Sequence, residues 1–252
     1  MTRQQVKKEL IALFNKLDRL MHIFLARLEA RETRTADEFK EALHPRKENG
    51  QFKIKGRVFT SKNDIQSFMD EPIKQWQKQL IYDETEAIYS YTTDGFKIVN
   101  QYLRGVISKT DANKDDVDSF IKNLDNLISK FDLPDNITVY RGVDLNVLPP
   151  ISNPDELKKY IGGEYVNEGY SSSSMLSNVE IVKSKPCIFE ITIPKGKGNG
   201  AYINSLAGHY EDVEFEFLIR RNATFDILDI DVIGENKFFI KMELKDAGKK
   251  EM

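Results

Sequence analysis

The chain has 252 residues with 37 basic and 40 acidic side chains, so its formal net charge at pH 7 is −3. Hydrophobic residues make up 40% and charged residues 31%, which is typical of a soluble globular protein. A single cysteine, Cys187, excludes an intramolecular disulfide framework and a cysteine-based zinc cluster, and the three histidines (His22, His44, His209) lie too far apart for a local metal motif.

The first 57 residues form a basic segment, with 14 Lys and Arg against 8 Asp and Glu, whereas the remainder has 23 against 32. Apolar residues between Val6 and Leu28 recur at three- and four-residue spacing, which predicts an amphipathic helix. A membrane-surface helix is one interpretation. Acidic residues are interleaved with the basic ones, so we favour packing on the main domain or on a second copy, and residues 1–43 could also bind a delivery partner.

Residues 44–52 contain proline and glycine, lack a helical period and are expected to be a linker. We therefore predict an extension over 1–57 and a main domain over 58–252. The N-terminus is too mixed in charge for a secretory signal, and no apolar run approaches the roughly 20 residues that span a bilayer. We expect a protein that is cytoplasmic in the producing cell or is delivered into a target cell by a route that the sequence does not reveal.

Helices are predicted first in the main domain. Apolar spacing indicates one helix from Ser61 to Leu80, a second opening at Asp83, a third over 96–103 and a fourth over 117–131. Strands follow, at 137–140, 164–166, 186–193, 201–203, 213–219, 224–230 and 238–244. Helices followed by strands predict an α+β fold, with the helices packed against a mostly antiparallel β-sandwich core.

Three short segments carry residues suited to catalysis. In the strand predicted over 213–219, Glu214 and Glu216 point to the same face, about 6.5 Å apart along the strand. The serine run over 171–174 lies in a predicted loop and could hold a carboxylate by hydrogen bonding. Arg141 ends a predicted strand, where it could bind a phosphate, and Gly142 would let the backbone turn or a ligand approach. A solvated sheet face, a flexible turn and a surface ion pair are the alternative interpretations of these segments.

In this order, Arg141, the Ser-x-Ser of 172–174 and the Glu-x-Glu of 214–216 resemble the mono-ADP-ribosyltransferases of the Arg/Ser-x-Ser/Glu-x-Glu class. That family includes the actin-modifying subunits of bacterial binary toxins and the exoenzymes that modify Rho. The segment over 91–104 is also similar to a helical element of the family, and 191–203 is similar to its central strand pair. The segment over 216–225 is similar to the strand and turn that follow the family's catalytic glutamate. The resemblance covers roughly residues 59–245.

The resemblance implies an enzyme that cleaves the nicotinamide–ribose bond of NAD, its substrate, without a metal. Glu216 would stabilise the cationic ribose centre, and Ser172 would hold Glu216 in place. Arg141 would bind the NAD pyrophosphate. The other residues assigned by the resemblance to NAD binding are Asn100, Lys185, Gly142, Tyr91 and Phe96.

Glu214 bears on the acceptor. In the family a glutamate at this position accompanies modification of arginine, and a carboxylate can orient a guanidinium and accept its proton. The resemblance therefore implies transfer to arginine of a target protein, actin or another host protein, with Tyr210 helping to recognise it. The sequence departs from the family at Ser173, where threonine is usual, and at Gly169, where binary toxins carry an asparagine.

Other functions remain open from the sequence. The same residues would support an NAD glycohydrolase, in which water accepts the ADP-ribose. A non-catalytic binding module is a second alternative. A phage head protein carrying the transferase domain is a third, because residues 44–52 resemble a basic stretch of phage head proteins. The acidic main domain argues against a nucleic-acid partner.

Overall fold

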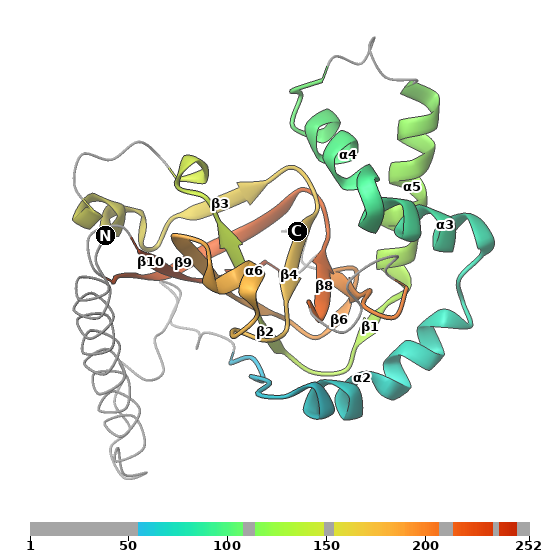
Figure 1. Cartoon of the computed structure of the whole chain (residues 1–252), viewed down its shortest axis with the longest axis horizontal. Helices are drawn as coiled ribbons and strands as arrows, with labels where there is room; N and C mark the ends of the chain where they lie inside the picture. The colour runs from blue at the N-terminus through green and yellow to red at the C-terminus, as the bar shows by residue number, and fades with distance from the viewer. Residues whose placement is uncertain (1–54, 108–113, 149–153, 207–213, 234–236, 246–252) are drawn as a thin grey trace, which may run out of the picture. The chain divides into compact units, whose positions relative to one another are not determined.

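The computed structural model describes residues 55–107, 114–148, 154–206, 214–233 and 237–245 (Figure 1). The predicted N-terminal helix and linker lie outside these residues. The compact unit that contains the described residues begins at residue 54. Arg57 belongs to it, because its backbone N–H donates to the Asn136 carbonyl at 2.8 Å and its carbonyl accepts from the Thr138 N–H at 2.9 Å.

The predicted helices are confirmed in position and order. They are α2 (Lys62–Gln77), α3 (Tyr82–Ser90), α4 (Phe96–Leu103) and α5 (Lys114–Lys130). Between α3 and α4 the chain forms a π-helical turn, Tyr91–Gly95, which the apolar spacing did not predict. A short helix, α6 (Glu180–Lys183), packs on β2.

Helix α2 begins where the Ser61 side chain accepts a hydrogen bond from the Asp64 N–H. Its apolar face includes Trp76, which is buried and donates from Nε1 to the Leu127 carbonyl of α5 at 2.9 Å. The Trp76 ring also contacts Phe131 edge to face, at a centroid distance of 5.3 Å. These contacts join α2 to the C-terminal end of α5.

Eight strands form the main sheet, in the order β3-β9-β10-β5-β2-β4-β8-β7, and β1 pairs with β6 apart from it. All neighbouring pairs are antiparallel except β5 with β10. The strands are β1 (Asp132–Leu133), β2 (Ile137–Val143), β3 (Glu164–Asn167), β4 (Ser171–Ser174), β5 (Cys187–Ile193), β6 (Gly196–Lys197), β7 (Gly200–Tyr202), β8 (Glu216–Ile219), β9 (Ala223–Val232) and β10 (Phe238–Leu244).

The α+β class with a mostly antiparallel core is confirmed. The sheet consists of a five-stranded ladder (β3, β9, β10, β5, β2) and a three-stranded ladder (β4, β8, β7), joined through the single pair Tyr140–Ser174. The two layers expected of a sandwich are thus connected by hydrogen bonds. In Figure 1, β4 and β8 cross the direction of β9 and β10, and α3, α4 and α5 lie together beside β8.

Three predictions about the site segments were wrong. Arg141 does not end a strand, because β2 continues to Val143. The serine run is not a loop: it is β4, a strand between β2 and β8. The strand predicted over 213–219 begins only at Glu216, because Phe215 has a left-handed backbone (φ 50°) that breaks the strand alternation.

Candidate active site

A cleft of about 540 Å³ lies where the π-helical turn and α4 face the junction of the two ladders. Its volume is within the range of ligand pockets, about 300–1,000 Å³. Every predicted catalytic and NAD-binding residue lines this cleft: Tyr91, Phe96, Asn100, Arg141, Gly142, Ser172, Lys185, Glu214 and Glu216. Tyr210, the predicted target-recognition residue, lies outside the described residues.

Glu216 is the buried carboxylate of the cleft, at the start of β8 and only 9% exposed. Burial raises its pKa to about 7, and the neighbouring Glu214 adds to this rise. A hydrogen bond from the Ser172 side chain and the charge of Arg141 act in the opposite direction, because both favour the ionised form. Glu216 therefore changes charge near neutral pH, and its immediate partners determine the pH at which it does so.

Glu214 lies two residues earlier, half-buried, and burial raises its pKa as well. The two carboxylates do not share the face of one regular strand, because the left-handed Phe215 separates them. The Phe215 ring is buried and its carbonyl accepts from the Met175 N–H at 3.1 Å, which fixes this turn of the chain. Both glutamates nevertheless line the cleft, one inside β8 and one before it.

Arg141 lies within β2, paired with Phe189 of β5, rather than at the end of a strand as predicted. Its Nη1 donates to the carbonyl of Ser172 in β4. Burial lowers the Arg141 pKa, but a guanidinium remains charged at any physiological pH. Arg141 thus places a cation in the cleft and connects the two ladders where few backbone hydrogen bonds do so.

Gly142 has a packing role that the sequence interpretation missed. A Cβ at this position would lie 2.7 Å from the Ile181 carbonyl of α6 and 2.7 Å from Cγ of Lys185. The absence of a side chain therefore lets α6 and the Lys185 stem approach β2. Lys185 itself is paired, since its Nζ lies 2.9 Å from Oδ2 of Asp144, another residue of the cleft.

Asn100 connects α4 to two tyrosines of the cleft. Its Nδ2 donates to the Tyr91 hydroxyl at 3.0 Å, and its Oδ1 accepts from the Tyr170 backbone N–H at 2.8 Å. Its Oδ1 would also lie 2.5 Å from a Cβ on Gly169, so a side chain at that position would displace the amide. The NH2 and the carbonyl oxygen of the Asn100 amide thus both make hydrogen bonds within the protein, in addition to any contact with a ligand.

Aromatic rings form one wall of the cleft. Tyr91 is buried, with its pKa raised mainly by that burial, and its ring contacts Phe96 and Tyr170 at centroid distances of 6.5 and 5.7 Å. Phe96 is more exposed and opens toward solvent. The π-helical turn that carries Tyr91 is a distortion often found at functional sites.

Sequence reasoning missed part of the lining. Tyr170 could have been found, since an aromatic residue directly precedes the serine run, but the apolar residues carry no signal of their own. Ser173 and Ser174 also line the cleft and belong to the predicted serine segment. The lining residues that were not predicted are Thr92, Thr93, Tyr140, Val143, Asp144, Val147, Tyr170, Ile181 and Val182.

The described residues include neither a cluster of metal ligands nor a membrane-spanning helix. Among them, no group of three or more His, Cys, Asp or Glu side chains is arranged to hold a metal ion. Within the same ranges, no helix is long and apolar enough to cross a membrane.

Comparison with known proteins agrees with the geometry. The family described as ADP-ribosyltransferase exoenzyme matches residues 65–247. The chain is 30% identical, over 70% of its length, to the NAD(+)–arginine ADP-ribosyltransferase EFV of Enterococcus faecalis, but spans only 34% of that protein. It is 28% identical to the epidermal cell differentiation inhibitor of Staphylococcus aureus, over 70% of this chain and 82% of the relative. The crystal structure of C3stau2 from S. aureus with NAD superposes with a TM-score of 0.65 at 20% identity, covering 77% of this chain and all of that one.

Proposed function

The chain belongs to the ADP-ribosyltransferase exoenzyme family, and we propose that it transfers ADP-ribose from NAD to an arginine of a target protein. In this reaction the bond between nicotinamide and the ribose C1′ breaks, and nicotinamide leaves with the bonding electron pair. A guanidino nitrogen of the acceptor forms the new bond to C1′ and loses a proton. We further propose that the protein acts as a toxin or effector of a bacterium or phage.

The observation that carries the proposal is the meeting of Arg141, Ser172 and Glu216 in one cleft, although they come from three separate strands. The ribose centre becomes cationic as nicotinamide leaves, so a carboxylate held nearby stabilises the transition state. Glu216 supplies that charge. Ser172 orients its carboxylate through the hydrogen bond described above.

NAD suits the remaining groups of the cleft. The Arg141 guanidinium has five N–H donors, and a pyrophosphate can accept several of them at once. Tyr91 and Phe96 offer aromatic surface to the rings of a dinucleotide. Lys185 would reach a phosphate by exchanging the Asp144 carboxylate for it. The similar staphylococcal structure was solved with NAD, which supports the same substrate here.

The choice of arginine as the acceptor depends on Glu214. Its position before Glu216, at the half-buried edge of the cleft, lets it face an incoming guanidinium and accept the proton released. The name of the enterococcal relative, an NAD(+)–arginine ADP-ribosyltransferase, supports this assignment. The target would be actin or another host protein, recognised with the help of Tyr210. Residues 1–43 remain candidates for binding a delivery partner.

The test is release of nicotinamide from NAD, with and without agmatine, a free guanidino acceptor. We expect agmatine to accelerate release by the wild-type protein. Glu216→Gln removes the stabilising charge and is expected to lower release by at least about 100-fold. Glu214→Gln should keep NAD cleavage and lose transfer to agmatine.

The outcomes separate the alternatives. Release that agmatine does not change would indicate an NAD glycohydrolase or a different acceptor. No release above the Glu216→Gln background would contradict the enzymatic proposal as a whole and favour a binding module.

A further inference from the structure

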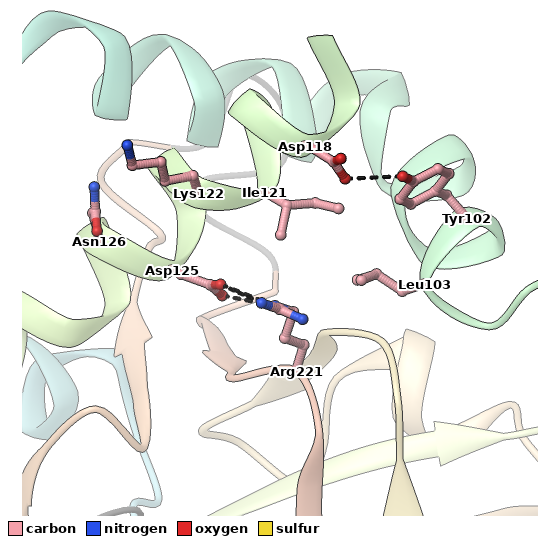
Figure 2. Close-up of a pocket in the computed structure, with 8 residues that line it drawn as sticks. All are labelled: Tyr102, Leu103, Asp118, Ile121, Lys122, Asp125, Asn126 and Arg221. Atoms are coloured by element: carbon pink, nitrogen blue, oxygen red, sulfur yellow. Dashed lines mark hydrogen bonds and ion pairs between the residues drawn. The ribbon is translucent and has the colours of Figure 1, made fainter. Parts of the chain in front are cut away.

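Outside the cleft, one carboxylate contacts the segments that flank both catalytic strands. Asp125 lies on α5 and lines a second pocket, of about 480 Å³, between α4, α5 and the turn after β8 (Figure 2). It is 36% exposed. Asp125 has no place in the proposed chemistry, which takes place in the other cleft.

The first contact of Asp125 is with Tyr170, two residues before Ser172. The Tyr170 hydroxyl donates to Oδ1 of Asp125 at 2.7 Å, and its side chain is completely buried. The Tyr170 ring lines the catalytic cleft and contacts Tyr91. Tyr170 therefore extends from the catalytic cleft to α5, where its hydroxyl is held mainly by Asp125 and also lies 3.2 Å from the Ile121 carbonyl.

The second contact is with Arg221, two residues after the end of β8. Its Nε donates to Oδ2 of Asp125 at 2.9 Å, and its Nη2 lies 2.8 Å from the same oxygen. Figure 2 shows the Arg221 side chain reaching from the strand turn up to α5. The pair is one-third exposed, so its charges are only partly screened by water.

The strand register shows why these two contacts belong together. Strands β4 and β8 are antiparallel, and Ser171 pairs with Ile219 and Ser172 with Leu218. Tyr170 and Arg221 therefore flank the same end of the strand pair. One carboxylate on α5 binds both, while Ser172 and Glu216 lie within the pair itself.

We propose that Asp125 is a positioning residue, which holds β4 and β8 in register against α5 so that Ser172 meets Glu216. The inference rests on the proposed function, because it concerns the alignment of two residues of that reaction. It assigns no contact between Asp125 and NAD.

The test is Asp125→Asn, which keeps the side-chain size and removes the charge that binds Arg221. We expect kcat for nicotinamide release to fall about 10- to 100-fold, since small displacements of catalytic groups have effects of this size. The acidic limb of the kcat/KM profile should move to higher pH. Weakening of the Ser172 bond removes a contact that favours ionised Glu216.

The direction of this movement distinguishes positioning from direct electrostatics. Loss of a negative charge acting through space would favour ionised Glu216 and move the limb to lower pH. The charged and titratable groups that act on Glu216 are Glu214 and Arg141, and Tyr91 faces it as well. Asp125→Asn replaces none of them. In the Ser172→Ala background, Asp125→Asn should cause no further movement, because the two residues act through one contact.

The matched control is Asp118→Asn. Asp118 lies two turns earlier on α5, lines the same pocket and accepts from the Tyr102 hydroxyl at 2.8 Å, but it contacts neither β4 nor β8 in the part of the chain described (Figure 2). We expect Asp118→Asn to leave kcat and the pH profile unchanged. If Asp125→Asn does not fold, Tyr170→Phe and Arg221→Gln each remove one of the two contacts and should each produce part of the effect.

The inference would be overturned if the acidic limb of the kcat/KM profile of Asp125→Asn stayed in place or moved to lower pH. It would also be overturned if Asp118→Asn changed kcat and the pH profile as much as Asp125→Asn does. For the two single-contact variants, an unchanged limb in both would do the same. If the wild type released no nicotinamide above the Glu216→Gln background, the proposed function itself would fail, so the two failures are distinguishable.

Discussion

In the proposed reaction Glu216 carries a negative charge at a position where burial opposes it. The protein resolves this conflict partly through Ser172 and Arg141, which favour the charged form, and the resulting pKa of about 7 lies close to the pH at which the enzyme would work. Below that pH the carboxyl is protonated and cannot stabilise a cationic ribose. The activity should therefore be sensitive to pH in the neutral range.

We predict that kcat/KM for nicotinamide release rises with pH and reaches half its maximum near pH 7, the value expected for ionisation of Glu216 in the free enzyme. Ser172→Ala removes a contact that lowers this pKa and should move the limb to higher pH. Glu214→Gln removes a neighbour that raises it and should move the limb to lower pH. Steady-state kinetics from pH 5 to 9 measure all three profiles.

The opposite directions of the two variants serve as mutual controls. Movement of both limbs in the same direction would indicate that a group other than Glu216 determines the profile. A profile flat through pH 7 would contradict the role of Glu216 as the essential anion.

Two buried glutamates lie near the N-terminal ends of different elements, Glu84 in α3 and Glu216 in β8, and they differ in how their charge is paired. Glu84, in the first turn of α3, is 1% exposed, and both its oxygens lie 2.6 Å from Nζ of Lys130 in α5. It also accepts from the Ile81 N–H at 3.1 Å. Glu84 thus joins α3 to α5 with its charge fully paired, whereas Glu216, at the start of β8, is charged only at an energetic cost.

We predict that replacing Glu84 and replacing Glu216 by glutamine have opposite effects on the free energy of unfolding at pH 8. Glu84→Gln should lower the free energy of unfolding by about 1–3 kcal/mol, because it leaves Lys130, which is 29% exposed, without its partner. Glu216→Gln should raise it by up to about 3 kcal/mol, the equivalent of a pKa raised from 4.5 to about 7. Urea unfolding measures both.

The pH dependence checks the cause. A carboxyl whose pKa is raised in the folded state stabilises the protein below its unfolded pKa and loses that contribution as pH rises through 7. The gain from Glu216→Gln should therefore shrink as pH falls below 7 and disappear below the unfolded pKa of 4.5. A gain that persists in full below pH 4.5 would indicate a packing effect rather than relief of a buried charge.

For the whole molecule, the cleft is assembled from residues between Tyr91 and Glu216, all within the compact unit that begins at residue 54. We predict that a variant lacking residues 1–53 keeps kcat/KM for nicotinamide release within about threefold of the full chain, since a domain with its own core can fold alone. Nicotinamide release with agmatine measures this, and circular dichroism verifies folding. A folded truncated variant without activity would place part of the catalytic machinery in the extension.

The order of the elements and the family could be predicted from the amino-acid sequence alone. The helices over 62–130 were predictable because their apolar residues repeat with the period of the helix, which is a local property. The residues of the cleft were predictable because Arg141, Ser172 and Glu216 occur in a recognisable order. The order of the three motifs can be read along the chain without knowing where their residues meet in the folded protein.

The geometry and the electrostatic environment of these residues depend on long-range contacts in the folded protein. A left-handed Phe215 and a π-helical turn at Tyr91 are backbone distortions that distant packing imposes, so local periodicity contains no sign of them. The serine run became a strand because β2 and β8 flank it. The contacts of Asp125 with Tyr170 and Arg221 join residues 45 and 96 positions away in the chain. Only folding brings such residues together. The groups that shift the pKa of Glu216 likewise become its neighbours only in the folded protein.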